Sequence, residues 1–232
     1  MKKWFLKTDF KLKILNFLKW KLIDIYRAVK YGRFFDEFGC TFYVGRQGSG
    51  KTTSMVEYLE GIRKKFPECL ILTNFDYKYQ TKALVGWRDL LDIRNGKKGV
   101  VFAIDEIHSE YSSADWKDFP EWLLREVSQQ RKQKIKIIVS SQVFIRVVKP
   151  LREQAFDVVE CRCIGKRWVF MRCFDGEEYN AIIDNPTPEK KWKLPRKWRR
   201  SYIMDDYIRS LFDTDKKIER MQGRDFIPRE VR

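Results

Sequence analysis

The chain has 232 residues, enough for one domain with a sizeable core, and a formal net charge of +16 from 48 Lys and Arg against 32 Asp and Glu. This excess indicates a polyanionic partner, either nucleic acid or an anionic membrane face, with a merely solvated basic surface as the alternative. No segment reaches the ~18 apolar residues that a membrane-spanning helix needs, and we find no internal repeat and no low-complexity tract.

The first 36 residues are predicted to form a basic amphipathic helix that is distinct from the rest of the chain. Lys7, Lys11 and Lys13 interrupt any apolar core of a signal peptide, so we do not expect export. The apolar face could dock on the main domain or on a neighbouring subunit, or it could lie on an anionic membrane. The apolar positions at helical spacing are Phe10, Ile14, Phe17, Leu18, Ile25 and Val29.

Residues 45–52 read GRQGSGKT, between an apolar run at 41–44 and a helical pattern at 52–65. A strand, a glycine-rich turn and a helix in this order are typical of a phosphate-binding loop, in which backbone N–H groups surround the anion. Lys51 is predicted to reach the β- and γ-phosphates, and the Thr52 hydroxyl to bind Mg²⁺. The predicted ATP-binding residues are Gly45, Arg46, Gln47, Gly48, Ser49, Gly50, Lys51, Thr52 and Thr53.

Residues 100–104 are all apolar and are predicted to form a central strand of a parallel sheet. The strand is followed by Asp105 and Glu106. A carboxylate at this point can hold Mg²⁺, and a second one beside it can polarise the attacking water. We therefore assign Asp105 to the metal and Glu106 to the water; a solvated acidic strand end is the alternative.

A further strand is predicted at 135–139, interrupted by Lys136 and followed by polar residues at 140–142. The Gln142 amide is suited to sensing the γ-phosphate or positioning water, although it could simply cap a loop. A helix is predicted from Asp118 to about Gln130. In a ring-shaped ATPase, a guanidinium from one subunit can complete the neighbour's site. Arg131, Arg146 and Arg152 are the candidates by position, and each could equally be a surface or DNA-backbone arginine.

The remaining chain is predicted to contain a hairpin and then a basic tail. Residues 158–163 and 168–173 alternate as strands do around a turn at Gly165 and Lys166. Residues 185–232 are interpreted as a separate tail, because 190–200 holds seven basic residues and no acids, interleaved with Trp192 and Trp198. Such a segment suits a nucleic-acid backbone, or equally an arm strapped across a neighbouring subunit.

The five cysteines, at irregular spacing, do not suggest a metal site. Cys161 and Cys163 lack the spacing of a zinc knuckle, and the sole histidine is His108. Two cysteines one residue apart lie on the same face of a strand, which favours core packing. We expect a reducing, cytoplasmic environment, with peripheral inner-membrane or virion association as further options.

Three segments together resemble the additional-strand, catalytic-glutamate branch of P-loop ATPases, and within it the FtsK–HerA class. They are residues 104–108 (IDEIH), 129–132 (QQRK) and 137–142 (IIVSSQ). Residues 70–75 also resemble the second strand of the zonular occludens toxin-like group, which includes filamentous-phage assembly ATPases and lies near small phage genome-packaging ATPases. The resemblance covers residues 38–165 and implies an α/β P-loop domain, here assigned to residues 37–184, with a central, mostly parallel sheet and helices on both faces.

This resemblance and the charge together imply ATP hydrolysis coupled to DNA movement in phage genome packaging or extrusion. They also imply a homo-oligomeric ring, with a capsid or portal-type partner as a further option. The alternative is a membrane-associated assembly or secretion ATPase that acts on protein. A small-molecule phosphotransferase should show an arginine-rich lid, which we do not find, and a non-hydrolysing adaptor would not need Glu106.

Overall fold

The computed structural model describes residues 10–31, 34–107, 121–184 and 194–213, in two compact units, residues 1–34 and 35–232. The first unit contains the predicted helix, α1 (Phe10–Tyr31). Among the described helices, none is both long enough and apolar enough to cross a membrane. The predicted cap at Asp118 and the residue His108 lie outside the described residues.

The second unit is built on one eight-stranded sheet, with strand order β3-β2-β4-β5-β1-β6-β7-β8. Its strands are β1 (Gly39–Val44), β2 (Leu70–Thr73), β3 (Lys82–Ala83), β4 (Val100–Ile104), β5 (Ile135–Ser141), β6 (Ala155–Ile164), β7 (Trp168–Asp175) and β8 (Arg196–Ile203). In this order, all neighbouring strands between β3 and β6 are parallel. The pairs β6–β7 and β7–β8 are antiparallel. The predicted α/β fold with a mostly parallel sheet is confirmed.

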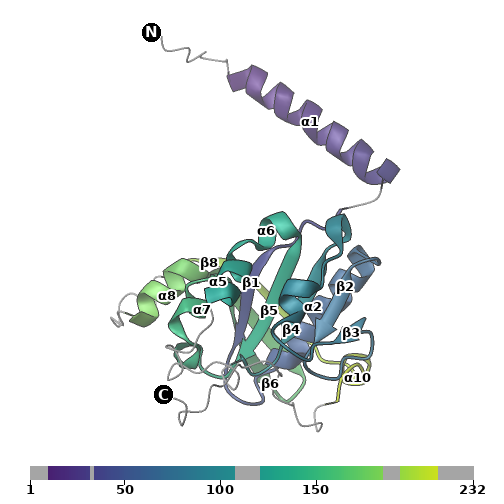
Figure 1. Ribbon diagram of the computed structural model, residues 1–232. Coiled ribbons are helices and arrows are strands. Elements are labelled where there is room, and N and C mark those ends of the chain that lie inside the picture. The colour runs from purple at the N-terminus through teal and green to yellow at the C-terminus, as the bar shows by residue number, and fades with distance from the viewer. Residues whose placement is uncertain (1–9, 32–33, 108–120, 185–193, 214–232) are drawn as a thin grey trace. The chain divides into compact units, whose positions relative to one another are not determined.

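Strands β4 and β5 are buried along their whole length because helices cover both faces of the sheet (Figure 1). One core cluster lies between the sheet and α2 (Lys51–Lys65), where Met55, Leu59 and Ile62 are buried as the helical periodicity predicts. The other lies on the opposite face, which carries α5 (Glu121–Ser128), α7 (Lys149–Arg152) and α8 (Gly176–Asp184). The short elements are α3 (Asp89–Asp92), η1 (Gly96–Lys98), α6 (Gln130–Gln133), η3 (Phe144–Arg146) and α10 (Asp206–Arg209).

Strand β5 lies between β1, which leads into the glycine-rich loop, and β4, which leads into Asp105. This inserted strand is the feature that the additional-strand branch implies. Lys136 does not interrupt β5: its ammonium is buried and donates hydrogen bonds to the Phe38 carbonyl at 3.0 Å and the Thr41 hydroxyl at 2.8 Å. Burial lowers the pKa of Lys136, partly offset by the nearby charge of Asp157.

The interpretation of residues 185–232 as a tail outside the ATPase domain is wrong for its described part. Strand β8 pairs with β7 along the hairpin and so extends the sheet as an edge strand. Within β8, the Tyr202 hydroxyl lies 3.2 Å from that of Ser54 in α2, and beyond the strand the Asp205 carboxylate caps α10. The basic composition did not indicate a strand. An edge strand can nevertheless be basic, because its side chains can remain in solvent.

Candidate nucleotide-binding and catalytic site

The loop between β1 and α2 has the backbone of a phosphate cradle. Gly45, Gly48 and Gly50 all have positive φ, at 153°, 73° and 86°. A Cβ on Gly45 would lie 2.6 Å from the Cys161 carbonyl oxygen, and one on Gly50 would lie 2.9 Å from a methyl of Val169. Glycine is therefore favoured by conformation at all three positions, and at Gly45 and Gly50 also by space.

Two buried polar side chains, those of Lys51 and Ser49, indicate that this loop can bind an anion. The Lys51 ammonium is only 5% exposed and donates to the carbonyl oxygen of Arg46 at 3.3 Å. The Ser49 hydroxyl is buried and has no hydrogen-bond partner among the described residues. A buried, unsatisfied hydroxyl is costly, and a phosphate oxygen in the cradle would satisfy it. Thr53 stays a predicted ATP-binding residue, and its hydroxyl donates back to the Gly50 carbonyl at 2.8 Å.

The two predicted magnesium ligands are brought together from distant parts of the chain. The Thr52 hydroxyl donates to the Asp105 carboxylate at 2.8 Å, although 53 residues separate them. Asp105 is 5% exposed, and its second carboxylate oxygen accepts a hydrogen bond from Ser140. A hydroxyl and a carboxylate, both oxygen ligands, fit Mg²⁺, which retains several waters in such sites.

Asp105 is also fixed through its backbone, by a residue to which the sequence interpretation gave no role. The Asn74 side chain, just after β2, accepts from the Asp105 N–H at 2.7 Å and donates to the Asp105 carbonyl at 3.1 Å. Asn74 directly follows β2 and Ser140 is the penultimate residue of β5, and both strands lie beside β4. Their position at the carboxyl ends of neighbouring strands was the available signal.

Glu106 has an unusual backbone that aims its side chain at the phosphate loop. Its φ is 54°, a conformation that costs a non-glycine residue about 1–3 kcal/mol and is concentrated at functional sites. The Ser140 hydroxyl accepts from the Glu106 N–H at 2.9 Å. The Glu106 carboxylate accepts from the Gln142 amide at 3.4 and 3.5 Å and lies 4.0 Å from the Lys51 ammonium.

The three candidate arginines fall into two groups. Arg131 and Arg146 are exposed, and the Arg131 guanidinium lies 5.4 Å from the centre of the Phe38 ring. Arg152 is 6% exposed; it donates to the Val147 carbonyl at 3.1 Å and lies 3.4 Å from the Asp184 carboxylate. The prediction that Arg152 could reach a neighbour's site is therefore withdrawn, because it holds α7 against α8.

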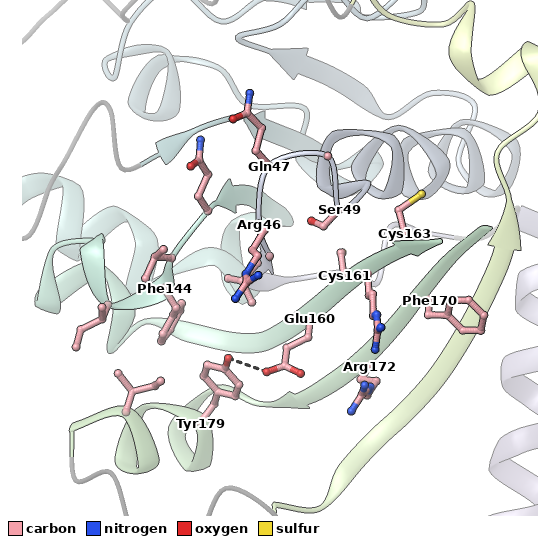
Figure 2. Close-up of a pocket in the computed structure, with 18 of the residues that line it drawn as sticks. Arg46, Gln47, Ser49, Phe144, Glu160, Cys161, Cys163, Phe170, Arg172 and Tyr179 are labelled. Carbon is pink, nitrogen blue, oxygen red and sulfur yellow. Dashed lines mark hydrogen bonds between the residues drawn. The ribbon is translucent and has the colours of Figure 1, made fainter. Parts of the chain in front are cut away.

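A cavity of about 1140 Å³ lies beside the phosphate loop, between it and the strands β6 and β7 (Figure 2). Arg46 lines the loop side, and Phe144 and Tyr179 line the side near α8. The Tyr179 hydroxyl donates to the Glu160 carboxylate at 3.0 Å, which orients that acid in the cavity wall. The cavity thus joins the phosphate cradle to an aromatic, partly charged pocket.

The phosphate loop, the inserted strand β5 and the carboxylates after β4 together define a P-loop NTPase fold. No family model and no curated protein match the sequence. Among solved structures, the chain is similar to the N-terminal domain of zonular occludens toxin from Neisseria meningitidis. The identity is 14%, the match covers 75% of this chain and 98% of that one, and the TM-score is 0.53.

The chain is also similar to the genome-packaging NTPase B204 from Sulfolobus turreted icosahedral virus 2. That match has a TM-score of 0.43 and 14% identity, and covers 72% of this chain and 92% of that one. At these identities the likeness concerns the fold. The resemblance inferred from the sequence motifs is confirmed at that level.

Proposed function

We propose that this protein is an ATPase that couples ATP hydrolysis to movement of DNA, in packaging or extrusion of a phage genome. The observation that carries the enzymatic part is the convergence of Lys51, Thr52, Asp105, Glu106 and Gln142 at one edge of the sheet. A protein that only bound nucleotide would not need a strained acid pointing at the phosphate loop.

ATP binding would be the task of the loop and of Lys51. The backbone N–H groups around the glycines and the start of α2 favour the β- and γ-phosphates, and the Ser49 hydroxyl gains a partner. Lys51, now shared between the Arg46 carbonyl and Glu106, would turn its charge to the phosphates. Thr52 and Asp105 would hold Mg²⁺, which when bound offsets phosphate charge.

Glu106 would act on the attacking water. Its carboxylate takes a proton from the water as the new P–O bond forms at the γ-phosphorus and the bond to the ADP oxygen breaks. The Gln142 amide, which contacts both Glu106 carboxylate oxygens, would orient that water. The Ser140 hydroxyl donates to the Asp105 carboxylate and accepts from the Glu106 N–H. It would therefore fix the position of the metal ligand relative to that of the general base.

A ring is part of this proposal, because in ring-shaped ATPases a guanidinium from one subunit can complete the neighbour's site. Arg131 or Arg146, both exposed, would complete the site of the neighbouring subunit. DNA as the partner is supported by the net charge of +16 and by the basic strand β8.

The alternative, an assembly or secretion ATPase that acts on protein at a membrane, is favoured by one feature. That feature is α1, whose apolar residues recur at helical spacing among lysines. The likeness to the zonular occludens toxin domain concerns the fold, so it does not distinguish between the two proposals.

The two functions are separated by measuring ATP turnover in the presence of single-stranded DNA, duplex DNA or anionic lipid vesicles. We expect at least one form of DNA to stimulate turnover severalfold and vesicles to leave it unchanged. Stimulation by vesicles alone would reverse the assignment. The Glu106→Gln variant serves as the control for contaminating ATPase, because its turnover should be at least about 10²-fold lower under every condition.

A further inference from the structure

One face of strands β6, β7 and β8, on the side of the sheet that carries α8, is covered by basic and aromatic side chains. We call it the arginine face. It is formed by Arg162 of β6, Trp168, Phe170 and Arg172 of β7, and Arg196 and Arg199 of β8. Its four arginines make no ion pair within the part of the chain that the structure describes.

The register of the sheet brings like charges together on this face. Arg172 and Arg199 are directly opposite each other on neighbouring strands. Like charges in that position destabilise a sheet, so the arrangement costs stability unless an anion lies over it. On β6, Glu160 lies directly opposite Arg172. Its carboxylate accepts a hydrogen bond from the Tyr179 hydroxyl.

Two further basic residues of β8, Lys197 and Arg200, are in a different environment. Arg200 pairs with Glu57 of α2, and Lys197 pairs with Asp157 and Asp175 at 2.8 and 3.1 Å. The basic residues of one strand are thus divided by the direction of their side chains. Arg200 and Lys197 are neutralised by these acids, and Arg196 and Arg199 on the arginine face are not.

Aromatic rings lie among these arginines. Trp168 is 47% exposed, and its ring centre lies 4.7 Å from that of Phe170, with 35° between the planes. Exposed rings interleaved with cations form the platform on which unpaired bases stack, while arginines contact the phosphates. A duplex offers phosphates but keeps the faces of its bases stacked inside, so it could not use the rings.

The arginine face continues into the nucleotide site. An open hollow of about 580 Å³ is lined by Arg162, Phe170, Arg172 and Arg199. The first three of these also line the cavity beside the phosphate loop, as Figure 2 shows for Phe170 and Arg172. A polyanion on this face would lie next to the site of ATP hydrolysis.

We propose that the arginine face binds single-stranded DNA, with phosphates on Arg162, Arg172 and Arg199 and bases stacked on Trp168 and Phe170. The inference rests on the proposed function, because it names the form of DNA that the motor would move. A second copy of this chain is a poorer occupant, since its net charge is also +16.

The test compares binding of a fluorescein-labelled oligothymidylate of about 30 nucleotides with that of a duplex of equal length, by fluorescence anisotropy over a salt series. Trp168→Leu removes the stacking surface but keeps an apolar side chain. Arg172→Gln with Arg199→Gln removes two charges from the arginine face. Lys197→Gln with Lys65→Gln removes two ion-paired charges that do not line the open hollow and is the matched control. Thermal unfolding and light scattering verify that each variant is folded and keeps its oligomeric state.

We expect Trp168→Leu to weaken oligothymidylate binding about 5- to 100-fold while duplex binding changes little. The variant of Arg172 and Arg199 should reduce the slope of log affinity against log salt by about 1.4, or 0.7 per phosphate contact on a single strand. The control variant should keep the slope of the original protein within error.

Equal losses in the two charge variants, or equal effects of Trp168→Leu on single strand and duplex, would overturn the inference. So would a folded Arg172 and Arg199 variant that loses its oligomers but keeps its DNA affinity. The proposed function fails separately, if neither form of DNA stimulates ATP turnover by the original protein. Oligothymidylate bound on this face without stimulation would support the inference and contradict the motor.

Discussion

The Lys51 ammonium lies 4.0 Å from the Glu106 carboxylate, so the residue assigned to the phosphates contacts the residue assigned to the water. A γ-phosphate in the cradle would draw the lysine charge to itself and leave Glu106 facing the space that the attacking water needs. Both side chains are held on rigid elements, Lys51 on the first turn of α2 and Glu106 after β4. The two roles can be separated by experiment, because Lys51 is assigned to ATP binding and Glu106 to hydrolysis.

Glu106→Gln should retain ATP binding and lose about 10²-fold or more in kcat, because the amide cannot accept the proton of water. Lys51→Ala should also lose tight ATP binding, because it removes the charge that contacts the phosphates. Filter binding of labelled ATP and release of phosphate separate the two effects. Near-normal turnover in Glu106→Gln would refute the assignment of the base.

Ser140→Ala should lower kcat about 5- to 100-fold, because one hydroxyl positions both the Asp105 carboxylate and the Glu106 N–H. It should also raise the Mg²⁺ concentration that gives half-maximal turnover, which a general loss of stability would not do. Ser140→Thr, which retains the hydroxyl, should recover part of the activity. Ser141→Ala is the matched control, since that hydroxyl donates to the Val143 carbonyl at 3.1 Å. An unchanged Mg²⁺ requirement in Ser140→Ala would exclude the positioning role.

Arg131→Ala or Arg146→Ala should bind ATP but fail to hydrolyse it, if that arginine completes a neighbour's site. Mixing the inactive variant with Lys51→Ala subunits, which carry an intact arginine, should restore part of the turnover. Activity per subunit should also rise with protein concentration. Arg152→Ala should instead destabilise the fold, because it removes a buried guanidinium that pairs with Asp184. Turnover that is flat on dilution to a verified monomer would argue against a shared site.

Glu60 should make the fold sensitive to acid. Burial alone would raise the pKa of Glu60, but hydrogen bonds from Arg63, Tyr77 and Tyr207 outweigh it and hold the pKa below its ordinary value of 4.5. The folded state therefore binds the proton less readily than the unfolded state. The resulting stability is complete above pH 4.5 and is lost as the pH falls through the lowered pKa.

Urea unfolding of Glu60→Gln and of the original protein between about pH 3 and pH 6 measures this contribution. The variant should be less stable at pH 6, and the difference in the free energy of unfolding should shrink as the pH falls. Glu68→Gln is the control, because the Glu68 carboxylate is largely exposed and pairs with Lys98 at the surface. A difference that stays constant with pH would mean that the hydrogen bonds do not lower the pKa of Glu60.

The local signals in the sequence were sufficient to predict the glycine-rich loop and the strand that carry the candidate site. The glycines at 45, 48 and 50 have the positive φ values that the loop requires, and the apolar run at 100–104 is β4 with the same bounds. These features depend on neighbours along the chain: glycine conformation, the period of a helix, and an uninterrupted apolar run. The hairpin of β6 and β7 was predictable for the same reason.

Only the tertiary structure decided what depends on pairing between distant strands. Asn74 and Ser140 became partners of Asp105 because β2 and β5 flank β4, and neither residue carries a local mark of that role. Arg152 was removed from the candidates by contacts with α8, about 30 residues away along the chain. Residues 196–203 have the composition of a solvated basic tail, and their pairing with β7 as β8 determines which arginines are neutralised by α2 and which remain on the opposite face. Composition records how many charges a segment has, but the direction of each side chain follows from the register of the sheet.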